Sequence, residues 1–293
     1  MESRCTSSAK QPADLQAIKE VLRAGRIAAP TAGHWHPGEI DWWFFYGPER
    51  LARTTIWTDV DGAAGWVLVD GASRSADAGI RPDLRGGPAE AEMVAHVERA
   101  LGDGPVTLFA SGLDEARRTL LTALGYQLGD PAFQVFAQPL ADPVDLPELP
   151  DGFRLLDAVT DEWVAERAEC HRRAFDPSLM TPERYHAFRE APDYDPRLDV
   201  AVASDDGRIV AYAMAWVDEL SRSGQLEPVG TRPHFWRRGL GRVANVEALR
   251  RMRERGVEVA GVNTWAGHGS NIPFYESCGF ERTTTIDRFS RPG

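Results

Sequence analysis

A proline-rich segment near the middle of the chain limits how the chain can fold more than any other feature. Residues 138–152, QPLADPVDLPELPDG, contain four prolines and four acidic residues. Proline lacks a backbone donor and restricts the residue before it, so this segment cannot continue a helix or a central strand. We therefore predict two folded halves, residues 1–140 and 153–293, joined by an extended linker at residues 141–152.

The C-terminal half alternates helical and strand-like patterns in an order that can be followed to its end. Val243, Val246, Leu249 and Met252 recur at helical spacing in its longest helix, which Gly256 ends. The predicted strands are 153–159, 198–204, 209–217, 224–231, 257–264 and 282–290, and the helices are 161–175, 181–191, 237–256 and 271–279. This order predicts a mixed α/β (α+β) fold class, in which helices flank a mostly antiparallel sheet.

The N-terminal half repeats this order more loosely. Pro82 in IRP corresponds to Pro233 in TRP at an offset of 151 residues. Gly125 in ALGY corresponds to Gly279 in SCGF at an offset of 154 residues. Two anchors with nearly the same offset indicate an old duplication, and so two domains of one type.

Composition excludes several function classes. The formal net charge of −11 argues against a nucleic-acid partner, which would require a basic face, and mildly favours cationic substrates. The three cysteines have no metal-type spacing, and no apolar stretch is long enough to span a membrane. The first residues also lack the apolar core of a signal peptide. We expect a cytoplasmic protein that holds no metal and does not associate with membranes.

The stretch HFWRRGLGR, residues 234–242, immediately precedes the longest predicted helix. A dinucleotide fingerprint does not fit, because its glycines must follow a buried strand directly and RPHFWRR intervenes. The first turn of a helix has unpaired N–H groups that suit an anion, and glycines let a phosphate approach them. On this turn alone, a solvated helix start with close packing explains the sequence equally well.

TRPHFWRRGLGR, followed by FYESCGF at residues 274–280, resembles the GNAT superfamily of acyl-CoA-dependent N-acetyltransferases. The family's pyrophosphate motif, [QR]-x-x-G-x-[GA], corresponds to residues 236–241, with Trp236 in place of Gln or Arg. The resemblance is strong from about residue 153 onward and weak before it. It implies two tandem GNAT-like domains and acetyl-CoA as cosubstrate. The implied cofactor-binding residues are Val229, Gly230, Thr231, Arg237, Arg238, Gly239, Leu240, Gly241, Arg242 and Asn271.

The chemistry of acyl transfer and the resemblance together imply two catalytic residues. An attacking amine needs a base, and Glu227 shares one face of its predicted strand with Val229 and Thr231. Tyr275 resembles the family's general acid for the departing thiolate. The alternative interpretations are a strand-end carboxylate for Glu227 and a core tyrosine for Tyr275, with Asp218 and Glu219 as reserve bases.

The N-terminal half is predicted to keep the fold without the chemistry. Pro88 and Glu90 stand where Gly239 and Gly241 stand in the other half, and Leu121 stands where Tyr275 does. A carboxylate repels a diphosphate, and proline removes one N–H group. The aromatic run at residues 34–47, HWHPGEIDWWFFYG, is interpreted as packing between the halves, with the wall of a substrate cleft as the alternative.

We therefore expect an acetyl-CoA-dependent N-acetyltransferase whose C-terminal half acetylates a primary amine on a small molecule. Two alternatives remain open at this point. One is an acyl-CoA-binding regulatory protein without transferase activity. The other is a protein similar to the mycothiol synthase-like acetyltransferases, which also pair two such domains. The expected assembly is a monomer or a homodimer.

Overall fold

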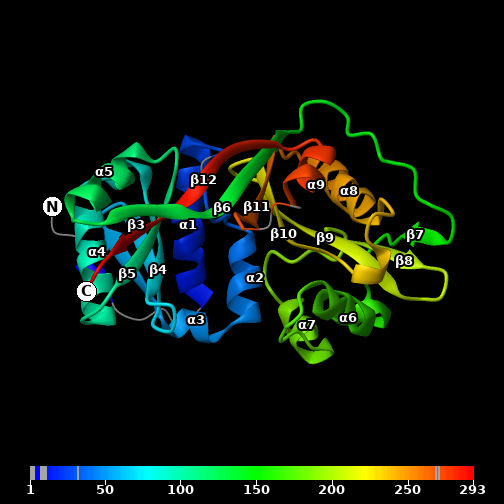
Figure 1. Ribbon diagram of the computed structural model, residues 1–293, viewed down its shortest axis with the longest axis horizontal. Coiled ribbons are helices and arrows are strands. Elements are labelled where there is room, and N and C mark those ends of the chain that lie inside the picture. Colours follow the sequence, from blue (N-terminus) through cyan, green and yellow to red (C-terminus); the bar gives the residue numbers. More distant parts are fainter. Residues whose placement is uncertain (1–3, 7–11, 32, 268, 270) are drawn as a thin grey trace.

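One mixed sheet runs through the whole molecule (Figure 1). The computed structural model describes residues 4–6, 12–31, 33–267, 269 and 271–293. Within these residues the sheet has twelve strands, in the order β1-β2-β3-β4-β5-β12-β6-β11-β10-β9-β8-β7. All neighbours are antiparallel except β4–β5 and β10–β11. The predicted fold class, with helices flanking mostly antiparallel strands, is confirmed.

The first α-helix of the N-terminal half is α1. Its helix α4 starts with a proline at the first position, where the missing N–H would have had no partner within the helix. Its described elements are β1 (Arg4–Thr6), α1 (Pro12–Ala28), α2 (Glu39–Tyr46), α3 (Glu49–Ala52), β2 (Thr54–Asp59), β3 (Gly62–Asp70), β4 (Ser75–Ile80), a 3-10 turn (Pro82–Leu84), α4 (Pro88–Leu101), β5 (Val106–Ser111), α5 (Glu115–Ala123) and β6 (Gln127–Pro139).

The C-terminal half follows the predicted order. Thr181 caps its second helix as predicted, since its side chain accepts from the N–H of Arg184. Its elements are β7 (Phe153–Leu155), a 3-10 turn (Asp161–Trp163), α6 (Val164–Ala174), α7 (Pro182–Phe188), β8 (Asp199–Ser204), β9 (Ile209–Asp218), β10 (Ser223–Thr231), a 3-10 turn (Pro233–Phe235), α8 (Leu240–Glu254), β11 (Val259–Trp265), α9 (Asn271–Ser277) and β12 (Glu281–Arg291).

The two halves exchange their last strands at the centre of the sheet. β6 ends the N-terminal half but pairs with β11, from Phe133–Trp265 to Pro139–Val259. β12 ends the C-terminal half but pairs with β5, and on its other side with β6. The division at residues 141–152 therefore separates the two halves along the chain but not in space. Each half completes its part of the sheet with a strand from the other half.

The linker at residues 141–152 connects the centre of the molecule to its far edge. Figure 1 shows it in green, passing along the outer side of α8 and α9 before it reaches β7. Val144 and Leu149 pack against the core around α8. An extended, proline-rich chain suits this role, because it spans a long distance per residue without needing partners of its own.

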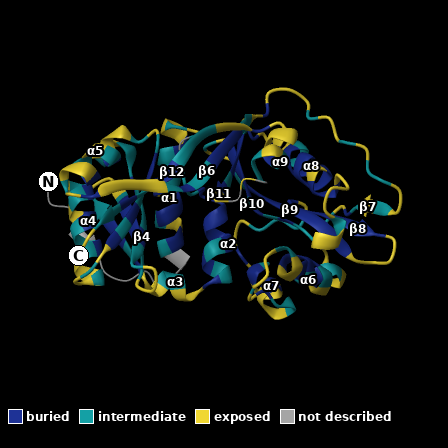
Figure 2. Ribbon diagram, viewed as in Figure 1, coloured by how far each residue is buried: buried dark blue, intermediate teal, exposed yellow. Residues whose placement is uncertain are grey.

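The aromatic run at residues 34–47 joins the halves by packing. Most of it forms α2, which lies at the junction and is largely buried (Figure 2). Trp42 lies in a core cluster with Tyr185, Phe188 and Trp216 of the C-terminal half. The predicted packing role is confirmed, although the sequence analysis did not expect these residues to be helical.

Ionic contacts from one face of α1 reinforce this junction. Lys19 lies 2.7 Å from the carboxylates of both Asp41 and Asp193, and Arg23 lies 2.8 Å from Asp218. Lys19 and Arg23 are one helical turn apart, so they point in the same direction. Asp41 is fully buried, and its charge depends on Lys19 for compensation.

We expect Lys19→Met to destabilise the protein by about 3 kcal/mol, because removing one partner leaves a buried charge uncompensated. Denaturant titration would measure this change. The control is Arg53→Met, which removes an exposed pair with Asp70 and should cost about 1 kcal/mol or less. Equal losses in the two variants would show that the Lys19 contacts do not hold the halves together.

Candidate functional site

The central parallel pair of the C-terminal half separates part-way along its length. β10 and β11 pair from Ser223–Val259 to Leu226–Val262. On the other side of β10 the ladder shifts between Leu226 and Val229, so Glu227 and Pro228 form a bulge. Bulges redirect side chains and often lie beside active sites. The strands thus open just where the predicted acyl site begins.

Beyond the bulge, β10 presents the predicted residues to the opening between the strands. Glu227, Val229 and Thr231 are half-buried, whereas Pro228 and Gly230 are buried. This alternation is consistent with the prediction that the first three share one face. The face of β10 that carries Glu227, Val229 and Thr231 is therefore the one that has access to solvent.

The arginine–glycine turn packs against the end of β10. Gly239 has a φ of 79° and immediately precedes α8, a conformation that favours glycine. Gly241 is buried, and a Cβ atom there would lie 2.7 Å from Oγ1 of Thr231. A side chain at position 241 would therefore crowd both the turn and the strand.

Three arginines at this turn are left available for an anion. Arg237, Arg238 and Arg242 are exposed, and none forms an ion pair with another described residue. In the same helix, by contrast, Arg250 and Arg251 both pair with Glu247. Unpaired arginines next to a helix N-terminus form a strongly positive site that is suited to phosphate.

Two carboxyl groups, one from each half, converge beside the opening. Burial raises the pKa of Glu227 to about 8. Glu39, in α2, is 3% exposed, and its pKa is also raised to about 8, first by burial and second by the charge of Glu227. Two such groups repel each other when both are ionised, so near neutral pH they favour holding at least one proton.

The sequence analysis missed the contribution of the N-terminal half to this site. Besides Glu39, it supplies His36, whose backbone N–H donates to Glu39 at 3.1 Å. It also supplies the buried Arg26, which attracts Glu39 electrostatically and donates to the carbonyl of Trp35 at 3.2 Å. One signal was available in the sequence, namely two acidic residues inside an otherwise aromatic run. Carboxylates are seldom buried unless they are paired, so their position among aromatic residues could have indicated a functional site.

Tyr275, on α9, is 7% exposed and packs between Phe136 and Phe280. Burial raises its pKa well above the usual value, and the nearby charge of Glu227 adds to this effect. Its hydroxyl forms no hydrogen bond with another described residue, whereas those of Tyr185 and Tyr212 do. A protonated hydroxyl close to Glu227 and without a structural partner is free to act as an acid.

The remaining candidate residues lie in different surroundings. Asn271 begins α9 and donates to Oγ1 of Thr264 at 2.8 Å, so it stabilises the end of β11. Burial raises the pKa of the Cys278 thiol to about 11, which disfavours a thiolate nucleophile. The reserve base Asp218 lies at the far end of the β9–β10 pair, bound by Arg23 and Ser221, and Glu219 is exposed.

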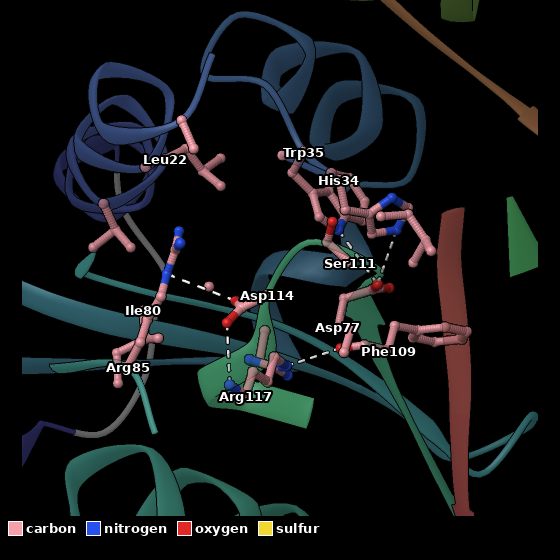
Figure 3. A pocket seen from close by; sticks show the side chains of 18 of the residues that line it. Leu22, His34, Trp35, Asp77, Ile80, Arg85, Phe109, Ser111, Asp114 and Arg117 are labelled. Carbon is pink, nitrogen blue, oxygen red and sulfur yellow. Dashed lines mark hydrogen bonds and ion pairs between the residues drawn. The ribbon is translucent and has the colours of Figure 1, made fainter. Parts of the chain in front are cut away.

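The N-terminal half contains a related opening. β4 and β5 pair at Ser75–Thr107 and Ala76–Leu108 and then separate. A cavity of about 90 Å³ lies there between α1 and the two strands, with His34, Trp35 and Asp77 among its lining residues (Figure 3). Glu227 does not line this cavity, although Arg26, which attracts Glu39, does.

The described residues contain no group of three or more His, Cys, Asp or Glu side chains that could hold a metal ion. Nor does any helix among them have the length and apolar character needed to cross a membrane.

Residues 154–280 match the family model described as Acetyltransferase (GNAT) family. The C-terminal half belongs to the GNAT family. This match supports an N-acetyltransferase of the GNAT type, a family whose enzymes use acetyl-CoA.

Related proteins extend this similarity over most of the chain. A Thermobispora bispora protein named mycothiol acetyltransferase is 26% identical over 84% of this chain and 86% of its own. A protein of the same name from Thermomonospora curvata is 29% identical over 76% of this chain and 75% of its own.

Solved structures show the same fold across both halves. A tandem GNAT protein from the clavulanic acid biosynthesis pathway has a TM-score of 0.66 at 16% identity, covering 99% of this chain and 98% of its own. A GCN5-related N-acetyltransferase from Sphaerobacter thermophilus has a TM-score of 0.62 at 20% identity, covering 100% and 96%. The predicted pair of tandem GNAT-like domains is confirmed as the fold.

The raised pKa of Glu39 predicts a pH-dependent stability. A group whose pKa is higher in the folded state stabilises it fully below the ordinary pKa of 4.5, and this contribution is lost as pH rises to about 8. We expect Glu39→Gln to flatten the decline of melting temperature between pH 5 and 8. Each unit of pKa shift corresponds to about 1.4 kcal/mol. The exposed Glu92→Gln serves as control, and identical slopes for both variants would refute the assignment.

Proposed function

We propose that the chain transfers the acetyl group of acetyl-CoA to a primary amine, which attacks the thioester directly. One observation carries the proposal: the arginine–glycine turn, with three unpaired arginines, lies at the end of the same strand that holds Glu227 beside the opening. Neighbouring residues would therefore bind the diphosphate and remove the proton from the amine.

The turn would hold the diphosphate, with its backbone N–H groups and arginines as donors. The pantetheine arm would enter between β10 and β11, where their pairing has ended. There the N–H of Val229 would donate to the oxygen of the thioester as it gains charge. The proposed acetyl-CoA contacts are Val229, Gly230, Thr231, Arg237, Arg238, Gly239, Leu240, Gly241, Arg242 and Asn271.

The reaction needs two proton transfers. Glu227 would accept a proton from the ammonium group, directly or through water, and the free amine would then attack the carbonyl carbon. Collapse of the tetrahedral intermediate expels the thiolate of CoA, which would take a proton from Tyr275. A base with a pKa near 8 is well matched to an ammonium group at neutral pH.

The acceptor would be a small, cationic molecule. The carboxyl groups of Glu39 and Glu227 lie near each other, so an ammonium group between them would relieve their repulsion. A mycothiol-related amine is the second candidate acceptor, because the relatives named mycothiol acetyltransferase match over most of their length. In either case the enzyme would act in the cytoplasm as a monomer or homodimer.

Release of free CoA thiol on presentation of an amine panel, with mycothiol-related amines included, tests this function. We expect acetyl-CoA to be consumed with at least one member of the panel. Tight binding of acetyl-CoA without turnover on any amine would instead support a regulatory acyl-CoA-binding protein.

The pH dependence tests Glu227. A base must be deprotonated, so kcat/KM should rise with pH through about 8 and then level off. Glu227→Gln should lower the plateau by about 100- to 10,000-fold and remove this acidic limb. Glu219→Gln, which alters an exposed carboxylate nearby in the sequence, should leave the profile unchanged. An unaltered limb in Glu227→Gln would assign the base elsewhere.

Tyr275→Phe separates an acid from a packing residue, because it removes one hydroxyl and keeps the ring between Phe136 and Phe280. We expect turnover to fall about 100-fold or more while acetyl-CoA affinity and melting temperature stay close to those of the wild type. Both would be measured on the same preparation. A destabilised variant with full turnover would refute the catalytic role.

A further inference from the structure

The N-terminal half keeps part of the backbone of the turn that is proposed to bind the diphosphate. A 3-10 turn at Pro82–Leu84 precedes α4, just as the turn at Pro233–Phe235 precedes α8. Gly86 has a φ of 68°, and Arg237, which occupies the matching position 151 residues later, has a φ of 60°. The two turns share this order and one left-handed residue, but the left-handed Gly239 directly before α8 has no counterpart, because the extended Gly87 precedes α4. The part that they share would be expected to offer N–H groups to an anion.

In the N-terminal half, however, a carboxylate of the chain itself already occupies this turn. Glu90 is 1% exposed, and its Oε2 accepts from the N–H of Gly86 at 2.7 Å. Its Oε1 lies 2.7 Å from Nη1 of Arg117, which is also buried and donates from Nε to the carbonyl of Phe109. A glutamate in the first turn of a helix that accepts from a preceding N–H also resembles a helix cap. Whether it is described as a cap or as a bound anion, a carboxylate of the chain itself fills the anion site.

The corresponding position in the C-terminal half is Gly241, which has no side chain to place there. Pro88 adds a second difference, since it stands at the first position of α4 and lacks the N–H that Gly239 retains. Figure 3 shows the cavity of the N-terminal half, where Asp114 pairs with Arg85 and accepts from the backbone N–H of Arg117. The guanidinium groups of Arg85 and Arg117 therefore already lie beside carboxylates.

We propose that Glu90 acts as an internal anion that closes the N-terminal turn to a diphosphate, so that the chain binds a single CoA, in its C-terminal half. The inference rests on the proposed function for the location of that one site. A CoA diphosphate could enter the N-terminal turn only if Glu90 left it, because like charges at one helix N-terminus repel each other. Its departure would also leave the guanidinium of Arg117 buried without its carboxylate. The N-terminal half would then serve to build the acceptor side of the site through α1 and α2.

Titration of the full-length chain with CoA, followed by calorimetry and native mass spectrometry, tests the proposal. We expect one CoA per chain in the wild type and none in Gly241→Glu, which places a carboxylate in the C-terminal turn. Gly241→Ala controls for crowding of Thr231. Two CoA molecules per wild-type chain would overturn the inference. Absence of CoA binding in the wild type would instead refute the proposed function, and the next experiment would still decide the role of Glu90.

The second experiment uses inorganic pyrophosphate in the Gly241→Glu background, where only the N-terminal turn can respond. Adding Glu90→Gly should raise pyrophosphate affinity at least tenfold, because it frees the N–H of Gly86 and the guanidinium of Arg117. Adding Glu92→Gly, an exposed residue on the same helix, should have no such effect. If Glu90→Gly does not fold, Glu90→Gln keeps the side-chain size and should shift affinity in the same direction. Unchanged affinity in the folded variant would overturn the proposal.

Discussion

The exchange of β6 and β12 is the constraint on which the rest of the structure depends. Backbone hydrogen bonds run from β5 to β12, to β6 and then to β11, so the centre of the sheet belongs to both halves at once. A strand removed from the middle of a sheet leaves two rows of unpaired groups, which is costly in a buried setting. The two halves therefore form one cooperative unit, although they are consecutive along the chain.

This continuity determines the composition of the candidate site. Because the strands are shared, α2 of the N-terminal half is held against β10 of the C-terminal half, and Arg23 of α1 pairs with Asp218 at the end of β9. Glu39 then lies close enough to Glu227 for the two charges to interact, in surroundings that raise the pKa of both. The second half alone has the binding turn, Glu227 and Tyr275, but it lacks the wall that opposes them.

The two related turns differ in what lies beside their N–H groups. Both follow a 3-10 turn and a left-handed residue, and both begin a long helix. At the turn before α8, glycines leave the N–H groups accessible and the arginines are unpaired. At the turn before α4, Glu90 and Arg117 neutralise each other inside the protein. Burial of the carboxylate, more than its presence in the sequence, closes the second turn.

The sequence by itself determined the order of the elements in the C-terminal half, the correspondence of the two halves and the composition of the arginine–glycine turn. These depend on local rules: helical spacing in α8, a cap at Thr181, and a glycine before α8 with a left-handed φ. Only the tertiary structure decided which half each final strand would join and that Glu39 would lie beside Glu227. Strand partners and buried charge pairs involve residues that are far apart in the chain, so a local sequence pattern cannot predict which of them will meet. The raised pKa of Glu39 depends on the same long-range packing, because desolvation is a property of the surroundings and not of the residue.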